Sequence, residues 1–407
     1  MRIIVQKFGG TSVASPEARG CALNKIKAAR QQGCTPIVVV SAMGRKGENY
    51  ATDTLLGIAA AAYKNIAARE RDQIMNCGEI ISAVVMAGTL QAAGMDAVAL
   101  TGGQAGVTTD TNFGSARILK VDPARITSLV KAGKTPVVCG FQGISTEGEL
   151  TTLGRGGSDT TAAALGVALN AELVEIYTDV DGIMTADPRI VNNAKILDCI
   201  SYSEVCQLAH QGAKVIHPRA VEIVMPRGIP LVVKSTFSDA PGTLITNIVK
   251  ENTEGTAVTD RIATGVTYLG NIAQVKIDVT ADDTGKAGFT VFKIMADNGI
   301  SVDLINVNPG QIIFTVPECV ADKAAAKLKE CGYAAEIVYD CAKVSVVGGG
   351  MREVPGVMAS FVEALALNNI SILQTVDSHT SISALVSKLD TEKAVTALHE
   401  KFGLSKL

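Results

Sequence analysis

A lysine stands near the end of the first apolar run of the chain, followed shortly by two glycines: VQKFGGTSV, Val5 to Val13. Two interpretations are open. Lys7 can be the solvated end of a strand, with Gly9 and Gly10 forming a simple turn. Alternatively, the glycines bring backbone N–H groups close to an anion, and the lysine reaches the same charge. The second interpretation predicts a phosphate or carboxylate site at this turn.

A second glycine-rich loop, in TTLGRGGSDTTAAALG (151–166), comes directly before an alanine-rich stretch. Its glycines allow a ligand to approach the backbone closely. Ser158 or Asp159 can cap the helix that follows. Arg155 offers a planar fork that suits a carboxylate or a phosphate. An ordinary turn with an exposed arginine is the alternative, but a cation and a carboxylate around glycines at a helix start favour a ligand site.

Two further stretches are polar enough to take part in chemistry. YTDVDGIMTADPR (177–189) places Thr178 and Asp179 at a strand end, either as a functional edge or as a surface loop with Asx turns. GAKVIHPRAVE (212–222) offers Lys214, which as a lone lysine can equally be solvated, and Pro218 near a helix start. Walker, dinucleotide-binding and protein-kinase motifs are missing from the sequence, so a phosphate site here needs another scaffold.

Composition narrows the class of protein. The 407 residues are 47% apolar and 19% charged, which predicts two or three well-buried globular domains. A net charge of −3 and the lack of tryptophan argue against nucleic-acid binding. The sequence has no unbroken apolar run near the roughly 20 residues of a membrane span, and its start lacks the features of a signal peptide. Scattered cysteines without C-x-x-C pairs, and histidines without a cluster, predict a cytoplasmic protein with no metal site.

Over about the first 240 residues, β-branched runs alternate with alanine-rich stretches, which predicts a mostly parallel sheet covered on both faces by helices. Ligands of such sheets gather at the carboxyl ends of strands, where Lys7, Ser41, Thr178 and Asp179 are expected. The predicted strands are IIVQKFG, PIVVVSAM, AVALTG, PVVCGFQG, LVEIYTDV and IPLVVKST. The predicted helices are 17–32, 71–93, 122–132, 159–170 and 203–210.

The rhythm changes after a polar, turn-rich stretch at 238–256, a candidate hinge. An internal repeat follows, because Asn298-Gly-Ile-Ser301 recurs 70 residues later as Asn368-Asn-Ile-Ser371. Each copy follows a ferredoxin-like β-α-β-β-α-β pattern. We expect two small sheets that dock side by side and sense a ligand.

Taken together, these motifs resemble those of aspartokinases. KFGGTSV, SAMG, CGE, GFQG, TTLGRGGSDTTA, TDVDGIMTADPR and GAKVIHPRAVE occur in the order found in that family. The double β-α-β-β-α-β tail is similar to the family's paired ACT domains, so the resemblance covers essentially the whole chain. GRKGENYATDTLL and two tail segments, ISVDLINVNPGQIIFTV and ILQTVDSHTSISALV, look most like the monofunctional, diaminopimelate-sensitive aspartokinases of Gram-positive bacteria.

The resemblance implies an α/β amino-acid-kinase domain at 1–246, a hinge at 247–261, and ferredoxin-like ACT domains at 262–340 and 341–407. The implied reaction is ATP plus L-aspartate giving ADP and 4-phospho-L-aspartate. This is the first step of the aspartate pathway to diaminopimelate, lysine, threonine and methionine. Mg²⁺ would be held mainly by the ATP phosphates, without metal ligands from the protein.

Residue by residue, the resemblance implies that Lys7 and Asp159 are catalytic, and that Asp159 and Glu79 lie near the substrate ammonium group. Arg155 would hold the α-carboxylate of aspartate. Ser41, Thr52, Gly156 and Ser158 would complete the substrate pocket. Gly9 and Gly10 would line the phosphates of ATP. The remaining nucleotide-binding residues implied are Tyr177, Thr178, Asp179, Met184, Asp187, Pro188 and Lys214. Met184 and Lys234 replace a tyrosine and an arginine found in many relatives.

The ACT pair implies feedback control by an end-product amino acid and pairing of two chains into a homodimer. Asp283 and Gly285 at a helix start, with Asn306 on the facing strand, are the candidate effector residues. Many lysine- and threonine-controlled relatives carry glutamine-asparagine where this chain has Ile305-Asn306, which makes meso-diaminopimelate the first expectation and lysine the second.

Three other functions remain as alternatives. A kinase for glutamate or N-acetylglutamate is disfavoured by the ACT pair and by the CGE and GRGGSDTT motifs. A catalytically silent ACT sensor is disfavoured by the intact Lys7, Glu79, Arg155 and Asp159. An NAD-dependent oxidoreductase lacks its fingerprint.

Overall fold

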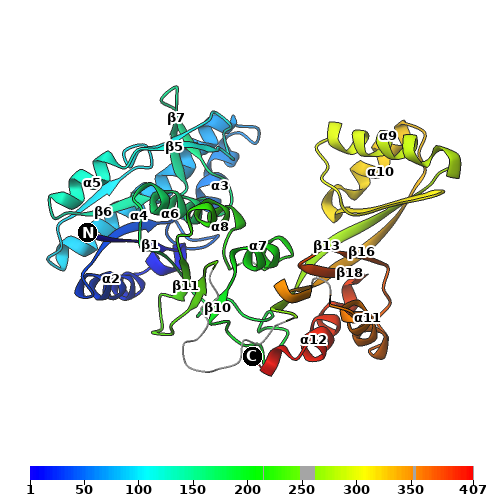
Figure 1. Cartoon of the computed structure of the whole chain (residues 1–407). Coiled ribbons are helices and arrows are strands. Elements are labelled where there is room, and N and C mark those ends of the chain that lie inside the picture. Colours follow the sequence, from blue (N-terminus) through cyan, green and yellow to red (C-terminus); the bar gives the residue numbers. More distant parts are fainter. Residues whose placement is uncertain (214, 248–261, 352–353, 407) are drawn as a thin grey trace. The chain divides into compact units, whose positions relative to one another are not determined.

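A computed structural model describes residues 1–213, 215–247, 262–351 and 354–406 (Figure 1). The chain divides into two compact units. The first unit comprises Met1–Ile183, Ile196–Ala209 and Lys214–Thr256. The second comprises Met184–Lys195, His210–Ala213 and Ala257–Leu407. These units are not continuous in sequence, unlike the domains expected above, and the expected domain boundaries stay predictions. Apart from Asn247, the expected hinge lies outside the described residues.

The first unit is built on an eight-stranded sheet with the order β10-β12-β11-β9-β1-β2-β6-β3. All neighbouring pairs in it are parallel except β11 with β12, as the sequence pattern predicted. In sheet order, the strands are Cys199–Ile200, Thr243–Ile245, Leu231–Ser235, Leu173–Thr178, Arg2–Phe8, Cys34–Val40, Thr135–Cys139 and Ala97–Leu100.

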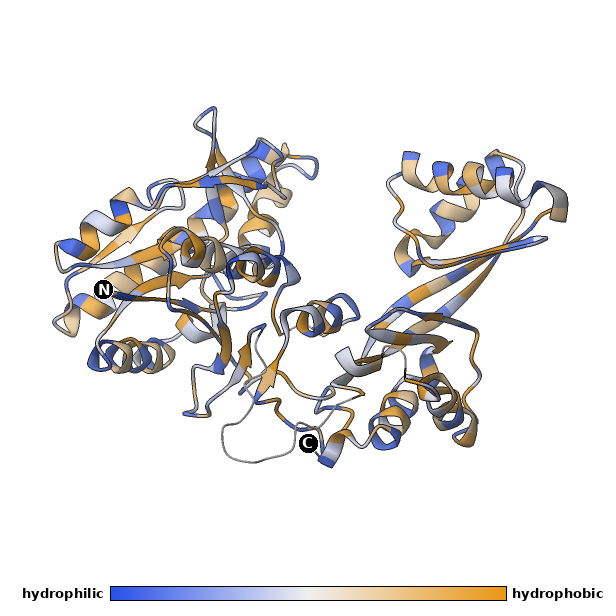
Figure 2. Cartoon of the chain, in the orientation of Figure 1, coloured by the Kyte–Doolittle hydropathy of each residue, from blue (hydrophilic) through white to orange (hydrophobic). Residues whose placement is uncertain are grey.

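Helices cover both faces of this sheet because its central strands bury apolar side chains on both sides, as the fully buried consecutive residues Val38, Val39 and Val40 of β2 do. Figure 2 colours each residue of the chain by its hydropathy. Helices α2 (Pro16–Gln31) and α4 (Ala68–Ala92) share a core with Phe8 and Tyr177 on one face. Neighbouring side chains of a strand alternate between faces, so Val174 points the other way. There it meets Gly166 of α6 (Gly157–Ala168), where an added Cβ would lie 2.5 Å from a Val174 methyl.

The remaining helical segments of the first unit are α1 (Gly10–Val13), α3 (Thr52–Ala62), α5 (Ala124–Lys131), α7 (Tyr202–His210), α8 (Pro218–Val224) and η1 (Met225–Arg227). Pro218 opens α8 as predicted. Helix α2 begins with a Ser15 cap, whose Oγ accepts a hydrogen bond from the Ala18 amide at 3.2 Å. Helix α3 lies in a stretch for which the sequence pattern predicted no helix.

The stretch PVVCGFQG is two strands, so the prediction of one continuous strand is wrong. The chain turns at Gly140 and Phe141, where Phe141 adopts a left-handed φ of 68°. Ser158 packs so closely there that a Cβ on Gly140 would lie 2.7 Å from the Ser158 Cβ. After the turn, the chain enters a four-stranded sheet with the order β5 (Ile118–Val121), β4 (Val107–Thr109), β7 (Gln142–Ser145) and β8 (Leu150–Thr152).

Helix α4 is, within the described residues, the one helix long and apolar enough to cross a membrane. Half of its most apolar window is buried inside the fold, however. The buried residues of α4 include Asp72, Asn76 and Glu79. Polar groups buried in this way need protein partners. Asp72 accepts hydrogen bonds from the Gly114 and Thr152 amides and from the Thr152 hydroxyl. The Asn76 side-chain amide donates to the Asp72 carbonyl, whereas Oδ1 of Asn76 has no partner within the described residues. Helix α4 is therefore a core helix of the first unit.

The second unit is a single six-stranded antiparallel sheet in the order β14-β15-β13-β16-β18-β17. In that order the strands are Asp303–Asn308, Gln311–Pro317, Gly265–Asp278, Ala335–Val347, Ser381–Ser387 and Gln374–Asp377. Its helices are α9 (Thr284–Asp297), α10 (Ala321–Glu330), α11 (Val357–Leu367) and α12 (Thr391–Lys401). Short 3₁₀ turns lie at Ala281–Asp283, Glu318–Val320, Gly349–Met351, Lys388–Asp390 and Leu404–Lys406.

The repeated β-α-β-β-α pattern is thus present twice, but the expectation of two separate sheets docked side by side is wrong. Strands β13 and β16 pair with each other from Gly265↔Val347 to Ile277↔Ala335 and so run through both repeats. Each repeat buries its own core, one under α9 and α10 and the other under α11 and α12. One ladder of backbone hydrogen bonds therefore joins the two repeats.

Part of the stretch expected to bind nucleotide packs within the second unit. Ala186 and Val191 belong to the same core cluster as Phe361. The Thr185 hydroxyl lies 2.9 Å from Nε2 of His399, a residue of α12 that is fully buried. The Thr185 carbonyl also accepts a hydrogen bond from the Val266 amide at 2.8 Å. The chain leaves the first unit after Ile183 and returns to it at Ile196.

Candidate active site

A cavity of about 290 Å³ opens in the first unit where β1 and β2 end and α6 begins. It gathers predicted site residues that are far apart in sequence, namely Lys7, Gly10, Ser41, Thr52, Glu79, Arg155, Gly156, Ser158 and Asp159. Five further residues complete the lining: Ala42, Gly44 and Phe141, to which the sequence reasoning gave no role, and Gly154 and Gly157, which it expected to let a ligand approach the backbone. Most of these lie in motifs that carried the family resemblance, SAMG, GFQG and TTLGRGGSDTTA, which was the available signal.

The Lys7 ammonium and the Asp159 carboxylate form an ion pair across this cavity. Nζ lies 2.7 Å from Oδ1, and both side chains are 12% exposed. Lys7 is the second-last residue of β1, and Asp159 lies in the first turn of α6. Because both side chains remain reachable from the cavity, an incoming anion can compete with the carboxylate for the lysine.

The glycine turn after β1 leaves no space for a side chain at Gly10. An added Cβ would lie 2.7 Å from the carbonyl oxygens of both Ala42 and Gly44. Gly44 in turn donates its amide to the Gly10 carbonyl at 3.1 Å. The amide of Gly9 donates to the carbonyl of Tyr177 at 3.1 Å. This hydrogen bond occupies the group that the resemblance assigned to phosphate, so an amide contact from Gly9 would require the bond to break.

Glu79 is a buried carboxylate that faces the cavity from α4. It is 2% exposed, and one oxygen accepts a hydrogen bond from the Ala42 amide at 3.2 Å. Within the described residues, its other oxygen has no partner. Burial raises the pKa of Glu79 to about 8, although the Ala42 amide lowers it in part. A cation beside this oxygen would favour the ionised form.

The loop between β8 and α6 presents Arg155 to solvent. Gly154 and Gly156 on either side adopt left-handed φ angles of 76° and 66°, which glycine accepts without strain. Helix α6 starts at Gly157, and its first turn lines the cavity. The N-terminus of a 12-residue helix favours negative charge at this point. The cavity thus combines an exposed arginine, a helix N-terminus and a buried acid.

Other predicted nucleotide residues do not line this cavity. Tyr177 is buried, stacks on Phe8 with ring centroids 4.8 Å apart, and donates its hydroxyl to Glu175 at 3.1 Å. Any contact from Tyr177 would therefore come from its main chain. Thr178 ends β9 and donates to Asp179, which pairs with Arg45.

The predicted residues of the loop that follows are part of the second unit. Met184, Asp187 and Pro188 belong to it, and Asp187 pairs with Arg189 at 2.6 Å. Lys214 lies outside the described residues. Their roles in nucleotide binding remain predictions.

The candidate effector residues lie at two places in the second unit. Asp283 ends a 3₁₀ turn directly before α9, and Gly285, in the first turn of that helix, has open space where a side chain would be. Asn306 lies in β14 as predicted, and its side-chain oxygen accepts a hydrogen bond from Gln374 of β17. Gln374 also accepts a hydrogen bond from Gln274 at 2.9 Å. Sequence reasoning missed this glutamine pair, which links the two edge strands to β13.

No group of three or more His, Cys, Asp or Glu side chains able to hold a metal ion occurs in the part of the chain that the structure describes. The acids nearest the cavity already have roles, since Asp159 pairs with Lys7 and Glu79 is buried.

Comparisons with known proteins fit this geometry. Residues 2–235 match the amino acid kinase family, and residues 336–400 match an ACT domain. The chain is 48% identical over 406 residues to aspartokinase 1 of Bacillus subtilis, with 100% of both chains covered. It superposes on E. coli aspartokinase III, solved in complex with aspartate and ADP, with a TM-score of 0.79, 25% identity and coverage of 98% and 99%. The T-state of that enzyme, with lysine and aspartate, gives a TM-score of 0.76, 26% identity and the same coverage.

The raised pKa of Glu79 predicts a pH dependence of stability. Between about pH 4.5 and 8 the folded chain holds a proton on Glu79 that the unfolded chain has lost, so the free energy of unfolding falls as pH rises. Glu79→Gln removes this dependence. We expect the difference in unfolding free energy, variant minus wild type, to grow by on the order of 4 kcal/mol from pH 5 to pH 8.

Urea unfolding at several pH values measures this difference. Glu222→Gln, which replaces an exposed carboxylate of α8 in the same unit, is the matched control and should give a flat difference. A flat difference for Glu79→Gln as well would show that Glu79 ionises normally in the folded protein.

Proposed function

The chain belongs to the aspartokinase family and transfers the γ-phosphoryl group of ATP to L-aspartate, and we propose that the cavity around Lys7, Glu79 and Arg155 is where this reaction takes place. The observation that carries the proposal is the 2.7 Å pair of Lys7 and Asp159 at the start of α6, in a cavity also lined by Glu79, one of whose oxygens has no partner within the described residues. The products are ADP and 4-phospho-L-aspartate, and the reaction opens the aspartate pathway.

The β-carboxylate of aspartate needs little chemical activation. It is ionised at neutral pH and attacks the γ-phosphorus directly, so no general base is required. The barrier is the repulsion between two anions and the charge that builds on the transferring group. Lys7 lies at the end of β1, where it can leave Asp159 and follow the γ-phosphoryl group. The N-terminus of α6 adds positive potential at the same place.

Aspartate is selected by its two other groups. The exposed Arg155 can grip the α-carboxylate with a planar fork. The ammonium group can enter beside Glu79, whose partnerless oxygen would then accept a charge-assisted hydrogen bond. In the enzyme without substrate, the pKa of Glu79 is raised to about 8, so the group is mostly protonated at neutral pH. Binding of the ammonium group favours the ionised form, and Glu79 then releases its proton. Aspartate affinity should accordingly increase as the acid ionises.

Mg²⁺ fits this site as part of the nucleotide. The described residues offer no cluster of metal ligands, which suits an ion that is held mainly by the ATP phosphates. When bound, Mg²⁺ neutralises phosphate charge that Lys7 alone cannot balance.

A kinase for glutamate or N-acetylglutamate is the alternative within the amino acid kinase fold. N-acetylglutamate lacks an ammonium group and would leave the second Glu79 oxygen without a partner. Purified enzyme with ATP, Mg²⁺ and hydroxylamine, tested with aspartate, glutamate and N-acetylglutamate, distinguishes the three by their acyl hydroxamates. Faster hydroxamate formation from either alternative acid would contradict the assignment of this cavity to aspartate.

Removal of the Lys7 charge provides the test of its catalytic role. Lys7→Ala should lower kcat by roughly 10²- to 10³-fold, since it removes a donor aimed at the transition state. Aspartyl hydroxamate formation measures the rate, and circular dichroism checks the fold. Lys27→Ala, at an exposed position of α2, should retain full turnover. Near-normal kcat in a well-folded Lys7→Ala enzyme would rule out the role of Lys7.

We further propose that the second unit senses an amino acid end product, meso-diaminopimelate first and lysine second. Two features support an amino acid ligand there. Asp283 precedes helix α9 as its N-cap, and the open position Gly285 lies in the first turn; the N-terminal amides of the helix suit a carboxylate. Asn306 offers an amide that can bond either end of an amino acid. The ligand would favour a less active arrangement by binding it more tightly.

Asn306→Ala should raise the effector concentration that halves activity by tenfold or more, through loss of a direct hydrogen bond. Titration of meso-diaminopimelate, lysine and threonine against activity measures the shift. Asn308→Ala, an exposed asparagine of the same strand, is the matched control and should keep wild-type inhibition. If no aspartate-pathway product inhibits the wild-type enzyme at millimolar levels, the sensor proposal fails.

We also propose a homodimer formed through the second unit, in the cytoplasm. Strand β14 lies at an edge of the sheet and exposes Ile305 and Val307, each 46% accessible, and α9 exposes Phe289. Apolar side chains on an unpaired edge strand favour pairing with a second copy. A cytoplasmic location agrees with nine cysteines that form no disulfide.

Sedimentation velocity tests the dimer. The wild-type enzyme should sediment as a species of twice the chain mass, and Ile305→Lys with Val307→Lys should shift it to the monomer. Leu119→Lys, an exposed apolar residue of the first unit that is 60% accessible, should leave the dimer intact. A monomeric wild-type enzyme at micromolar concentration would contradict the proposal.

A further inference from the structure

Arg219 has no part in the reaction described so far, although it lies beside the substrate loop. It is the second residue of α8 and is partly buried. Its Nη1 donates a hydrogen bond to the carbonyl of Leu153 at 2.8 Å, and its Nη2 donates to the carbonyl of Ala116 at 2.9 Å. Leu153 is the residue immediately before the Gly154–Gly157 loop. One guanidinium group therefore ties α8 to the point where the loop begins.

The same helix contacts the loop at a second point. His217 is the N-cap of α8, and its Nδ1 accepts a hydrogen bond from the Arg219 amide at 3.3 Å. The His217 side chain lies so close to Gly156 that an added Cβ there would be 2.2 Å from the His217 Cβ. The start of α8 thus contacts the chain on both sides of Arg155.

The strand that leads into the loop is also anchored from α4. The carboxylate of Asp72 is fully buried and accepts hydrogen bonds from the amide and the hydroxyl of Thr152, at 2.8 and 2.9 Å. The Leu153 amide donates to the Phe141 carbonyl at 2.9 Å. The contacts of α8 with Leu153 and Gly156 then help to set the direction in which Arg155 projects, together with the hydrogen bond from the Gly157 amide to the Gly154 carbonyl at 3.0 Å.

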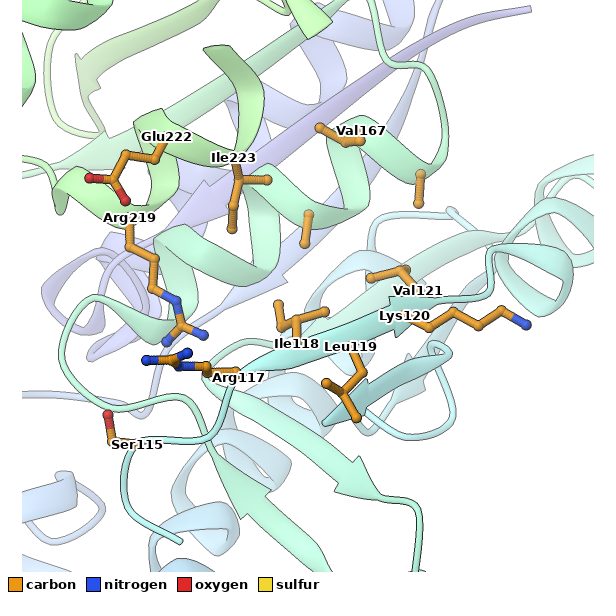
Figure 3. A pocket seen from close by; sticks show the side chains of 12 residues that line it. Ser115, Arg117, Ile118, Leu119, Lys120, Val121, Val167, Arg219, Glu222 and Ile223 are labelled. Atoms are coloured by element: carbon orange, nitrogen blue, oxygen red, sulfur yellow. The ribbon is translucent and has the colours of Figure 1, made fainter. Parts of the chain in front are cut away.

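The Arg219 guanidinium group is charged and partly buried, so it needs hydrogen bonds to stabilise its charge. Burial lowers the pKa of Arg219, and the neighbouring Arg117 lowers it further. Figure 3 shows the guanidinium groups of Arg117 and Arg219 facing each other at one end of a second cavity of about 700 Å³. A like-charged neighbour and partial desolvation both act against the charge on Arg219, while the nearby carboxylates of Asp110 and Glu222 raise its pKa. The two carbonyls that Arg219 binds add further stabilisation.

We propose that Arg219 is a positioning residue for L-aspartate, which holds the Gly154–Gly157 loop so that Arg155 can reach the α-carboxylate. This inference rests on the proposed role of Arg155. Arg219 itself does not line the substrate cavity. It acts through the loop, and the ATP side of the site is not expected to depend on it.

The role is tested by measuring KM for aspartate and KM for ATP in the same variants. Arg219→Met keeps much of the side-chain volume but leaves the carbonyls of Leu153 and Ala116 without donors. It should raise KM for aspartate roughly 10- to 100-fold, since small displacements of a binding group have effects of this size, and leave KM for ATP unchanged. Arg219→Lys, which retains a charged donor, should recover part of the loss. Because Arg219 borders an open cavity, these variants disturb little core packing.

Arg117→Met is the matched control. Arg117 is an exposed arginine on the wall of the same cavity, and within the described residues no acceptor for its guanidinium group lies at hydrogen-bond distance. This variant should keep the wild-type KM for both substrates. Circular dichroism and the melting temperature confirm the fold of each variant.

A double-mutant cycle with Arg155→Ala decides whether Arg219 acts through Arg155. The double variant should have the same KM for aspartate as Arg155→Ala alone. Once Arg155 has been removed, the loss of Arg219 has no arginine left to misplace and cannot raise KM further. Effects that multiply, or an equal rise in KM for both substrates, would overturn the positioning role. If Arg155→Ala leaves KM for aspartate unchanged, the assignment of Arg155 fails and the role of Arg219 fails with it. If Arg155→Ala raises KM and Arg219→Met does not, the positioning role alone fails.

Discussion

The Lys7 ammonium on the central strand β1 and the Asp159 carboxylate in the first turn of α6 form an ion pair 2.7 Å long. An ion pair this short requires that α6 start at the carboxyl end of β1. Close packing elsewhere in the first unit allows α6 to lie there. Gly166 lets α6 lie close to β9, and Gly140 lets the chain pass close to Ser158. Glycines 154 and 156 then turn the chain into the helix through left-handed conformations. A cation and an anion are thereby held together in a cavity that a stronger anion can enter.

Stability and function oppose each other at Glu79. This carboxylate is 2% exposed, and one of its oxygens has no partner within the part of the chain that the structure describes, so its ionised form destabilises the folded chain. The same oxygen is the one that we propose binds the substrate ammonium group. Asp72 on the same helix is equally buried, yet it accepts three hydrogen bonds and serves the fold. The contrast shows how one helix supplies both a structural and a chemical acid.

The second unit joins its two repeats through the long strands β13 and β16. A shift of these strands in one repeat would therefore also move the strands of the other. It also contains a stretch from the middle of the kinase sequence. Ala186 and Val191 share the core of α11 and α12, and Thr185 contacts the buried His399. Covalent continuity at Ile183 and Ile196 therefore links the packing of the sensing unit to two positions of the catalytic unit, which gives a physical route for coupling.

Local sequence determined much of this protein. The alternation of apolar strands and helices predicted the parallel sheet, Pro218 marked a helix start, and the spacing of Lys7, Ser41 and Thr178 placed them at strand ends. The repeat at Asn298 and Asn368 predicted the double tail. These features depend on neighbours within a few residues, and their pattern is visible in one dimension.

Tertiary structure decided the rest. Whether Glu79 keeps its proton depends on burial in a cavity built from distant segments, and the Gly9 amide is engaged by Tyr177, which is 168 positions further along the chain. The contacts of Arg219 with Leu153 and Ala116, and the single sheet of the second unit, likewise arise only when distant elements pack. Desolvation and long-range pairing have no one-dimensional pattern, because they are properties of the space around a residue rather than of its neighbours in sequence.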